Sequence, residues 1–386
     1  MKKPTRNEEA DGGEKAMSLL KRLREASVRF LIVRIDSGKR SAVVRAFLSG
    51  KIRRLRLYAF GLLTLAGCAA IGATGSTAAP AQLRPDIGTF IGEMVERHGF
   101  TQTELEHVLG AAQFQPSIIN AISKPATSKP WYEFRPLLVT PQRVTDGVAF
   151  WNSHVAVLER ARREFGIPEE IIAAVIGVET NYGVQSGRHR VLDALTTLAF
   201  DYPKRAEFFR NELEHYLLMG REQRADILNI KGSYAGAIGI PQFMPSSYRR
   251  YAVDFDNDGK TDLSGSTADA IGSVANYLKS YGWETEQTVA VPALVNGEDY
   301  HQAVYSGSKP FYTVEEMRKL GVAPQAPISG DRQVTLIELE NKSGNEHWLG
   351  FNNFFVITRY NRSVNYAMSV LQLAAEIRAA RNLTLQ

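Results

Sequence analysis

Cysteine is almost absent from this sequence, because the chain of 386 residues has only one, Cys68. A single cysteine has no partner in the chain, so an intramolecular disulfide is excluded. Internal repeats are absent too, which argues against a repeat architecture. Hydrophobic residues make up 44% of the chain. That content is too high for a disordered protein, and the length predicts two or three domains or one elaborated domain.

An excess of basic residues is also absent from the part of the chain that we expect to fold. The whole sequence has 46 Lys/Arg and 41 Asp/Glu. Residues 1–67 contain 16 of the basic residues and only 6 of the acidic ones. The remaining 30 basic and 35 acidic residues give a charge of −5 from Cys68 onward. A nucleic-acid module normally carries its basic surface within the folded part, so nucleic acid is not an expected partner.

Residues 1–67 have the order of a secretion leader, in which basic residues precede an apolar run. The run at residues 57–66 is short for a membrane span. Small residues continue to residue 75, which leaves an uncleaved anchor as the alternative. Fifty residues ahead of a signal are unusual, so we expect translation to begin further on, at Val43 or Val44 through a non-standard start codon.

The apolar run closes with the sequence LAGC, which resembles the lipobox of bacterial lipoproteins. In that motif the cysteine is lipidated and becomes the mature N-terminus, so Cys68 is the expected lipidation site. Residues 68–82 are rich in Gly, Ala, Thr, Ser and Pro and read as a tether. Residues 83–386 are then the folded body.

One carboxylate, Glu179, lies where a helix should be apolar. Pro168 fits the first position of a helix that should end near residues 181–183. Glu179 falls on the apolar stripe, one turn beyond Ile176. Burial and the negative end of the helix dipole would both raise its pKa, as a general acid requires. The alternative is a solvated carboxylate at a frayed helix end.

Apolar periodicity predicts a mainly α (α+β) protein. Short helices are expected within residues 86–122, and the helical pattern is expected to break at 125–136. Further helices are expected at 141–166, 192–200, 203–220, 268–281 and 312–320. Short β-prone segments are expected at 289–295, 334–339 and 354–358. A C-terminal helix is indicated by Ala367, Val370, Leu371, Ala374 and Ile377.

Three segments carry groups suited to sugars. Lys204 and Arg205 stand in a helix's first turn, where basic residues oppose the dipole, so they indicate a ligand role or an ordinary solvated face. The glycine-rich residues 232–248 offer the hydroxyl and amide groups of Ser233, Tyr234 and Gln242. Residues 359–363 mix an aromatic with hydrogen-bonding groups, which fits a sugar platform or a core strand end.

Residues 254–262 match most of the calcium loop of an EF-hand. Oxygen side chains occupy loop positions 1, 3, 5 and 9, and a glycine occupies position 6. Position 12 is Gly265 rather than glutamate, so Asp269 is the nearest candidate to close the site. The expected cofactor is structural Ca²⁺, and no organic cofactor is expected. The expected ligand set is Asp254, Asp256, Asp258, Lys260, Asp262 and Asp269.

These residues together resemble the lytic murein transglycosylases of the B type, which are lipoproteins with a lysozyme-like helical catalytic core. The motifs that carry the resemblance are GVETNYG, YPKRAEFF, LNIKGSYAGAIGIPQFMPSSY, YAVDFDNDGKTDL, DAIGSVANYL and ITRYNRSVNYAM. The resemblance implies a catalytic core at about residues 141–285 and a C-terminal part at about 286–386 that packs on it. It implies Glu179 as the single acid/base. The implied glycan-binding residues are Ser233, Gln242, Lys204, Arg205, Tyr360, Asn361 and Tyr366.

The family reaction cleaves the β-1,4 bond between N-acetylmuramic acid and N-acetylglucosamine and leaves 1,6-anhydro ends. The implied partners are peptidoglycan strands, the membrane through the lipid anchor, and proteins of cell-wall synthesis such as penicillin-binding proteins. The implied location is the periplasmic face of the outer membrane. Two alternatives are a hydrolysing lysozyme and a non-catalytic peptidoglycan-binding scaffold. The chain departs from the family pattern at Lys204, where the family has arginine, and in the calcium loop before Asp269.

Overall fold

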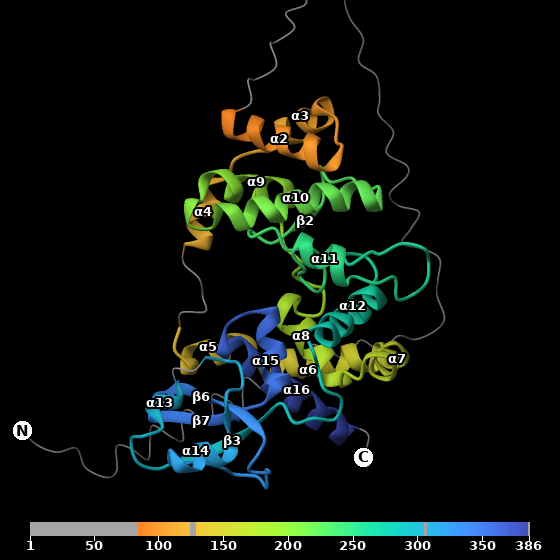
Figure 1. Ribbon diagram of the computed structural model, residues 1–386. Coiled ribbons are helices and arrows are strands. Elements are labelled where there is room, and N and C mark those ends of the chain that lie inside the picture. The colour runs from red at the N-terminus through yellow and green to blue at the C-terminus, as the bar shows by residue number, and fades with distance from the viewer. Residues whose placement is uncertain (1–83, 124–128, 305–306, 385–386) are drawn as a thin grey trace, which may run out of the picture. The chain divides into compact units, whose positions relative to one another are not determined.

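Helices make up most of the described chain, which comprises residues 84–123, 129–304 and 307–384 of a computed structural model (Figure 1). The predicted mainly α (α+β) class is therefore confirmed. The predicted leader, the tether and Cys68 lie outside the described residues. Among the helices of the described residues, none combines the length and the apolar character that a membrane span needs.

The first helices pack on α9 and α10, as Figure 1 shows. Phe90 of α2 meets Phe200 of α9 edge to face, with 6.0 Å between the ring centroids. The Asp193 carboxylate of α9 accepts a hydrogen bond of 2.8 Å from the backbone N–H of Gln113. These contacts join elements about a hundred residues apart. The elements are α2 (Pro85–His98), α3 (Gln102–Gly110), α4 (Pro116–Ile122), α9 (Val191–Asp201) and α10 (Ala206–Gln223).

The predicted break at residues 125–136 is wrong in its second half, because α5 spans Trp131–Leu138. Trp131 and Phe134 lie one turn apart and are both buried, so burial of one apolar face stabilises this short helix. Pro136 lies in the last turn, where few hydrogen bonds remain to be lost.

Helix α8 (Glu169–Thr180) occupies the centre of the described part and packs against α6, α7, α12 and α16. Every residue from 171 to 177 is buried. A helix that is apolar on all sides must be enclosed, and the surrounding helices meet that requirement. The other elements of this region are α6 (Pro141–Ser153), α7 (Val155–Phe165), β1 (His189–Arg190), η2 (Pro203–Arg205), β2 (Lys231–Gly232), α11 (Pro245–Tyr251) and α12 (Thr267–Ser280).

The single helix predicted for residues 141–166 is wrong, because it divides into α6 and α7 at His154. His154 has φ −127° and ψ 27°, outside the helical region. Its Nδ1 lies 2.8 Å from the carbonyl oxygen of Phe150, so the ring bonds to the end of α6. The apolar spacing runs through this break, which hides it from a periodicity argument. The predicted end at Gly166 is confirmed, with φ 75°.

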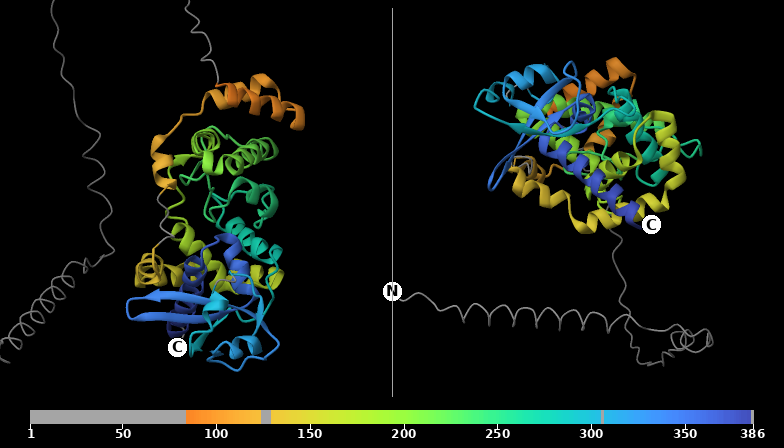
Figure 2. Two further views of the ribbon diagram at one scale, coloured as in Figure 1. Left: turned by 60° about the vertical axis from the view of Figure 1, so that its left-hand side comes forward. Right: turned by 90° about the horizontal axis from the view of Figure 1, so that it is seen from below.

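The chain after α12 contains an antiparallel sheet with the strand order β4-β6-β7-β3-β5. Side chains of this sheet and its neighbouring helices form a second apolar cluster. Figures 1 and 2 show the sheet next to α15 and α16. Strands β6 and β7 form its central hairpin, with Ile337 opposite Trp348. The predicted strands at 289–295 and 334–339 are confirmed. The elements are β3 (Ala290–Val295), α13 (His301–Val304), β4 (Tyr312–Thr313), α14 (Val314–Lys319), β5 (Val322–Pro324), β6 (Gln333–Asn341) and β7 (Gly344–Gly350).

The β-prone segment 354–358 is instead part of helix α15 (Asn352–Tyr360), so that prediction is wrong. Its β-branched and aromatic residues favour a strand locally. Phe354 and Ile357 are both fully buried and lie three residues apart, which a helix satisfies. Asn353 fixes the start, because its amide donates to the carbonyl oxygens of Glu284 and Gln287.

The predicted C-terminal helix is confirmed as α16 (Val364–Thr384). It packs along α8, α6, α5 and α15, so it closes the enclosure around α8. Tyr366 and Ile377 lie on its buried face, at 4% and 0% exposure.

Candidate active site

The C-terminal end of α8 carries Glu179, which is half-buried. The helix ends at Thr180, and the next three residues all have positive φ: 49° at Asn181, 60° at Tyr182 and 91° at Gly183. The predicted helix end is therefore confirmed, while Pro168 is the N-cap rather than the first helical residue. Two successive residues other than glycine in this conformation need support from neighbouring structure.

Tyr182 supplies that support by inserting its ring between α6 and α8. A methyl group on Gly147 would lie 2.5 Å from the Tyr182 hydroxyl oxygen, and one on Gly177 would lie 2.6 Å from ring carbon Cζ of Tyr182. The two glycines thus form a slot for the ring. The Tyr182 hydroxyl donates a 2.8 Å hydrogen bond to the carbonyl oxygen of Arg143. Sequence reasoning missed this role, although glycine within two buried helices signals a close approach.

Thr180 joins the end of α8 to the glycine-rich loop at residues 238–243. Its hydroxyl donates to the carbonyl oxygen of Ile240 at 2.8 Å and accepts from the N–H of Gly183 at 2.9 Å. The loop is closed by reciprocal backbone bonds between Ile238 and Phe243. The position of the loop relative to Glu179 is therefore set by hydrogen bonds.

The Glu179 carboxyl has one hydrogen-bond donor among the described residues, the hydroxyl of Tyr366, at 2.5 Å from Oε1. Burial raises the pKa of Glu179 to about 7, and the Tyr366 hydrogen bond opposes this rise. No neighbouring charge is among the causes. Glu179 can thus give up or take a proton near neutral pH.

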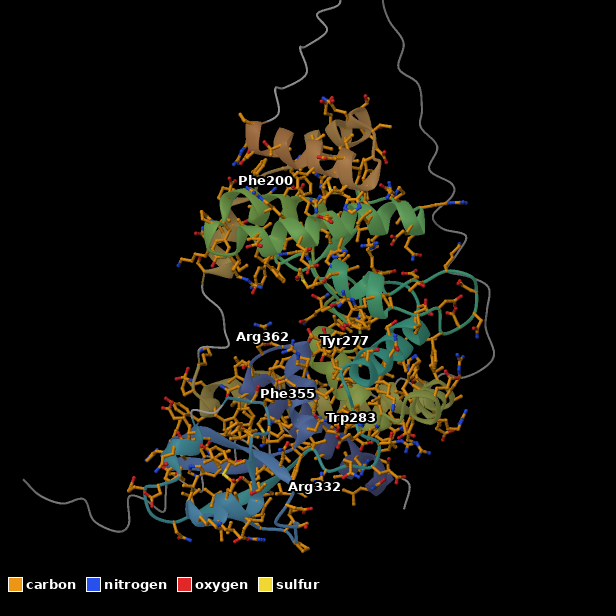
Figure 3. The ribbon with its side chains drawn as sticks, viewed as in Figure 1. Phe200, Tyr277, Trp283, Arg332, Phe355 and Arg362 are labelled. Carbon is orange, nitrogen blue, oxygen red and sulfur yellow. The ribbon has the colours of Figure 1, made fainter. Side chains whose placement is uncertain are left out.

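Tyrosines form a wall beside this carboxyl. The rings of Tyr360 and Tyr366 are stacked, 11° from parallel and 6.4 Å apart. The hydroxyl of Tyr360 donates to the carbonyl oxygen of Pro241, and that of Tyr277 donates to Arg359. Burial raises the pKa of both Tyr360 and Tyr366 well above the ordinary value, so both stay neutral. Tyr277, labelled in Figure 3, was not predicted as a site residue, because its helical spacing resembles that of core residues.

The side chains of Gln242 and Ser233 each have one hydrogen-bonding group that no described residue uses and that a ligand can therefore bind. Gln242, with φ 52°, uses its amide N–H groups on the carbonyl oxygens of Ser186 and Gly239, so its amide oxygen stays available. The Ser233 hydroxyl oxygen accepts from two backbone N–H groups, which leaves its hydrogen to donate. Both residues are half-buried.

Lys204, Arg205 and Asn361 are exposed and make no hydrogen bond to Glu179 or Tyr366 among the described residues. The two basic residues are exposed in η2, and the Arg205 guanidinium lies 4.3 Å from the ring centroid of Phe208. Asn361 is exposed and accepts from the N–H of Ser363.

The acidic loop brings together three of its predicted ligands. Carboxylate oxygens of Asp254, Asp256 and Asp269 all lie within 4.8 Å of one another. Calcium binds oxygen at 2.3–2.6 Å, so oxygens on one ion are separated by at most about 5 Å, and this cluster fits. Asp269, only 1% exposed, closes the loop by accepting from the N–H groups of Phe255 and Asp262.

Asp258 and Asp262, which were also predicted as ligands, are not members of that three-carboxylate cluster, and the prediction for Lys260 stays a prediction. Asp258 accepts from the N–H of Lys260 and so shapes the turn. Asp262 accepts from the N–H groups of Ser264 and Gly265. The loop is tied to the Glu179 end, because the carbonyl oxygen of Leu263 accepts a 2.8 Å bond from the N–H of Ile240.

The Tyr366 hydrogen bond predicts a measurable change in the acidity of Glu179. A hydroxyl donated to the ionised carboxylate lowers the pKa, so Tyr366→Phe should raise it above 7. The measurement is a carbon NMR titration of the glutamate carboxyl groups, with Glu179→Gln identifying the resonance. Tyr360→Phe is the matched control, because its hydroxyl binds Pro241 instead. An unchanged or lower Glu179 pKa in Tyr366→Phe would contradict the assignment.

The Glu179→Gln variant adds a stability check to the same experiment. The folded-state pKa of Glu179 is raised from 4.5 to about 7, so the folded state binds more protons than the unfolded state in this window. Wild-type stability should therefore fall relative to the variant as the pH rises from about 4.5 to 7. The melting temperatures of the two proteins across this range provide the comparison.

Comparison with known proteins identifies the family of the chain. A family model described as a transglycosylase SLT domain matches residues 82–375. The membrane-bound lytic murein transglycosylase B of Escherichia coli (strain K12) is 44% identical over 307 residues, which cover 77% of this chain and 84% of that protein.

Two solved structures are also similar. The Escherichia coli lytic transglycosylase Slt35 in complex with calcium has a TM-score of 0.71 and 44% identity, with 77% of this chain and 94% of that chain covered. SltB3 from Pseudomonas aeruginosa in complex with NAG-NAM-pentapeptide has a TM-score of 0.68 and 30% identity, with 76% and 79% covered. SltB3 was also solved with NAG-anhNAM-pentapeptide. The chain therefore belongs to the SLT-domain family of lytic transglycosylases.

Proposed function

We propose that this protein is a lytic transglycosylase that cleaves the β-1,4 bond between N-acetylmuramic acid and N-acetylglucosamine in peptidoglycan. The observation that carries the proposal is one half-buried glutamate, Glu179, with a pKa of about 7 and a single tyrosine donor among the described residues. Its family and the ligands of SltB3 support the same substrate class.

The first step uses Glu179 as an acid. Protonated Glu179 donates its proton to the oxygen that links the two sugars, and the bond from that oxygen to C1 of N-acetylmuramic acid breaks. The acetamido group of the same sugar stabilises the cationic C1. The Tyr366 hydroxyl stabilises the carboxylate that is left, because it donates to Oε1.

The second step uses Glu179 as a base. The carboxylate removes the proton from the 6-hydroxyl of N-acetylmuramic acid while that oxygen bonds to C1. The product is a 1,6-anhydro sugar, and Glu179 is again protonated. Because the attack is intramolecular, it benefits from an effective molarity of about 10⁵–10⁸ M for well-oriented groups.

The glycan contacts follow from the hydrogen-bonding functions left free. The Ser233 hydroxyl donates to the strand and the Gln242 amide oxygen accepts from it. Tyr360 and Tyr366 provide the wall beside the reacting sugar. Lys204, Arg205 and Asn361 bind parts of the strand further from the reacting bond.

A hydrolysing muramidase is the second candidate, and the number of carboxylates distinguishes the two. Ordinary glycosidases place a second carboxylate about 5–9.5 Å from the acid. Among the described residues no carboxylate is hydrogen-bonded to Glu179, and burial and the Tyr366 hydrogen bond account for its shifted pKa. This favours attack by the substrate's own hydroxyl over attack by an activated water.

Digestion of purified peptidoglycan in ¹⁸O-labelled water tests the reaction type directly. We expect unlabelled 1,6-anhydro products, one water lighter than hydrolysis products, by mass spectrometry. Glu179→Gln is the control, and its cleavage rate should fall by about 10²–10⁴. Label at the new reducing ends of the muramic residues would show hydrolysis and overturn the proposed reaction.

We also propose that the loop containing Asp254 and Asp256 binds structural calcium together with Asp269. Support comes from the spacing of their oxygens and from the calcium complex of Slt35. Calcium would join the loop to the start of α12. It would also fix Leu263, which holds the 238–243 loop through Ile240.

Calcium removal should lower the melting temperature, because an ion bound only by the folded state stabilises it. At a calcium concentration a hundredfold above Kd the expected shift is on the order of 5 °C. Asp254→Asn should reduce this shift in calorimetry, whereas Asp299→Asn, an exposed acid outside the loop, should not. A wild-type melting temperature that is the same in chelator and in millimolar calcium would refute the site.

The relative from Escherichia coli is membrane-bound, which is consistent with a place in the cell envelope. We propose an anchor at Cys68 that holds the enzyme on the periplasmic side of the outer membrane, on the basis of the LAGC sequence and the tether. Metabolic labelling with a clickable fatty acid should label the wild type and fail to label Cys68→Ser. Equal labelling of both proteins would exclude the anchor.

A further inference from the structure

A cavity of about 580 Å³ lies at the end of α8 opposite to Glu179. It is lined by the start of α8, by the segment 283–289 and by the later part of α16. Glu170 is the second residue of α8, and Glu179 follows nine residues later on the same helix. At 1.5 Å per residue, the two glutamates are separated by about 14 Å along the helix axis. The cavity is therefore distinct from the candidate active site.

Two buried polar atoms of the lining have no hydrogen-bond partner among the described residues. They are Oε2 of Glu170 and Nε1 of Trp283, a residue labelled in Figure 3. Glu170 is 6% exposed and Trp283 is 3% exposed. A buried polar group without a partner costs stability, and a buried indole N–H usually has an acceptor. A ligand in the cavity can supply both missing partners.

Both atoms are held in place by contacts elsewhere in their residues. Oε1 of Glu170 accepts a charge-assisted hydrogen bond from Nη2 of Arg378, so the carboxylate is fixed against α16 and only Oε2 is left as an acceptor. The backbone N–H of Trp283 donates to the carbonyl oxygen of Leu278 at 3.1 Å. An acceptor and a donor on different segments of the chain therefore line one cavity in fixed positions.

An uncharged amide satisfies both atoms at once. Its N–H can donate to Oε2 of Glu170, and its carbonyl oxygen can accept from Nε1 of Trp283. A cation would leave the indole N–H without an acceptor, and an anion would be repelled by the carboxylate. The side chains of Ile171, Leu371 and Ala374 in the same lining suit a small alkyl group attached to the amide. An acetamido group has all three of these parts.

The proposed substrate is rich in such groups, because N-acetylmuramic acid and N-acetylglucosamine each carry one. The cavity volume lies within the range of about 300–1,000 Å³ that is common for ligand sites. A neighbouring cavity of about 580 Å³ shares Glu170, Glu286 and Arg378 with the first. Glu286 and Arg378 are exposed and offer hydrogen-bonding groups to the hydroxyls of a sugar ring. The two cavities together have room for successive sugars of a strand.

We propose that this cavity is a second, non-catalytic glycan-binding site that holds the acetamido group of one N-acetylated sugar of a peptidoglycan strand. Glu170 accepts from the acetamido N–H, Trp283 donates to the acetamido oxygen, and the methyl group contacts Leu371 and Ala374. The inference rests on the proposed peptidoglycan substrate and adds a contact to the strand away from the bond that is cut. The enzyme would use this contact to stay on the polymer between cleavages.

The test is an NMR titration of ¹⁵N-labelled protein that follows the indole N–H of Trp283. Trp283→Phe identifies this resonance among those of the four tryptophans. The probes are N,N′-diacetylchitobiose, cellobiose, which has the same β-1,4 linkage without acetamido groups, and N-acetylalanine N-methylamide, which has amides without a sugar. We expect diacetylchitobiose to shift the resonance saturably. The other two probes should bind about tenfold more weakly or worse, because each lacks part of the hydrogen bonding.

Ala375→Phe tests where the sugar binds, because Ala375 is exposed on α16 and lines the cavity. The added ring should fill the cavity and weaken the binding of diacetylchitobiose at the Trp283 resonance about tenfold. Ala379→Phe, at a second exposed lining position, replaces it if the melting temperature of Ala375→Phe shows a folding defect. Ala156→Phe, at an exposed alanine of α7 that lines neither cavity, is the matched control and should bind like the wild type.

Three results would overturn the inference. The first is a Trp283 resonance that does not shift with diacetylchitobiose up to its solubility limit. The second is equal or tighter binding of cellobiose or of the capped alanine, which would assign the cavity to sugar hydroxyls or to a peptide. The third is a shift that persists unchanged in the cavity-filling variant, which would come from sugar bound near Glu179. None of these results bears on the proposed function, because the digestion in labelled water tests cleavage separately.

Discussion

The site depends on burying a carboxyl at the end of a helix that is otherwise apolar on every side. Helix α8 is enclosed by α6, α7, α12 and α16, so Glu179 has little water around it and one donor, Tyr366. Burial disfavours the charged carboxylate, and the tyrosine partly offsets that effect. The balance places the pKa near 7, where one residue can serve first as acid and then as base.

Hydrogen bonds extend this control from the helix end to the surrounding loops. Thr180 holds Ile240, and Ile240 in turn holds Leu263 at the end of the acidic loop. The amide of Gln242 is fixed in the same loop. One side-chain and one backbone hydrogen bond therefore connect the acidic loop to Thr180, the residue after Glu179, and distortion of the acidic loop would displace the loop that carries Gln242.

Local patterns predicted much of this arrangement. The spacing of Ile176 and Glu179 placed the carboxyl on a buried face, and the oxygen residues from Asp254 onward predicted the acidic cluster. These features need only a few neighbouring residues. The folded environment decided the rest: His154 interrupts a helix whose apolar spacing is continuous, and Phe354 lies in a helix despite strand-prone neighbours. The donor to Glu179 comes from 187 residues away, and the family resemblance had named Tyr366 only as a glycan-binding residue.

The position of α16 in the sequence also affects when the site can be completed during synthesis. Tyr366 belongs to α16, which follows the other described helices in sequence and closes the enclosure around α8. During synthesis or export, every earlier part of the protein emerges before the hydroxyl that sits on Glu179. A chain that has not yet delivered its C-terminal helix thus lacks both the dry surroundings and the donor of its acid. A transglycosylase of this architecture therefore gains the donor to its acid only after α16 has been made and has packed on α8.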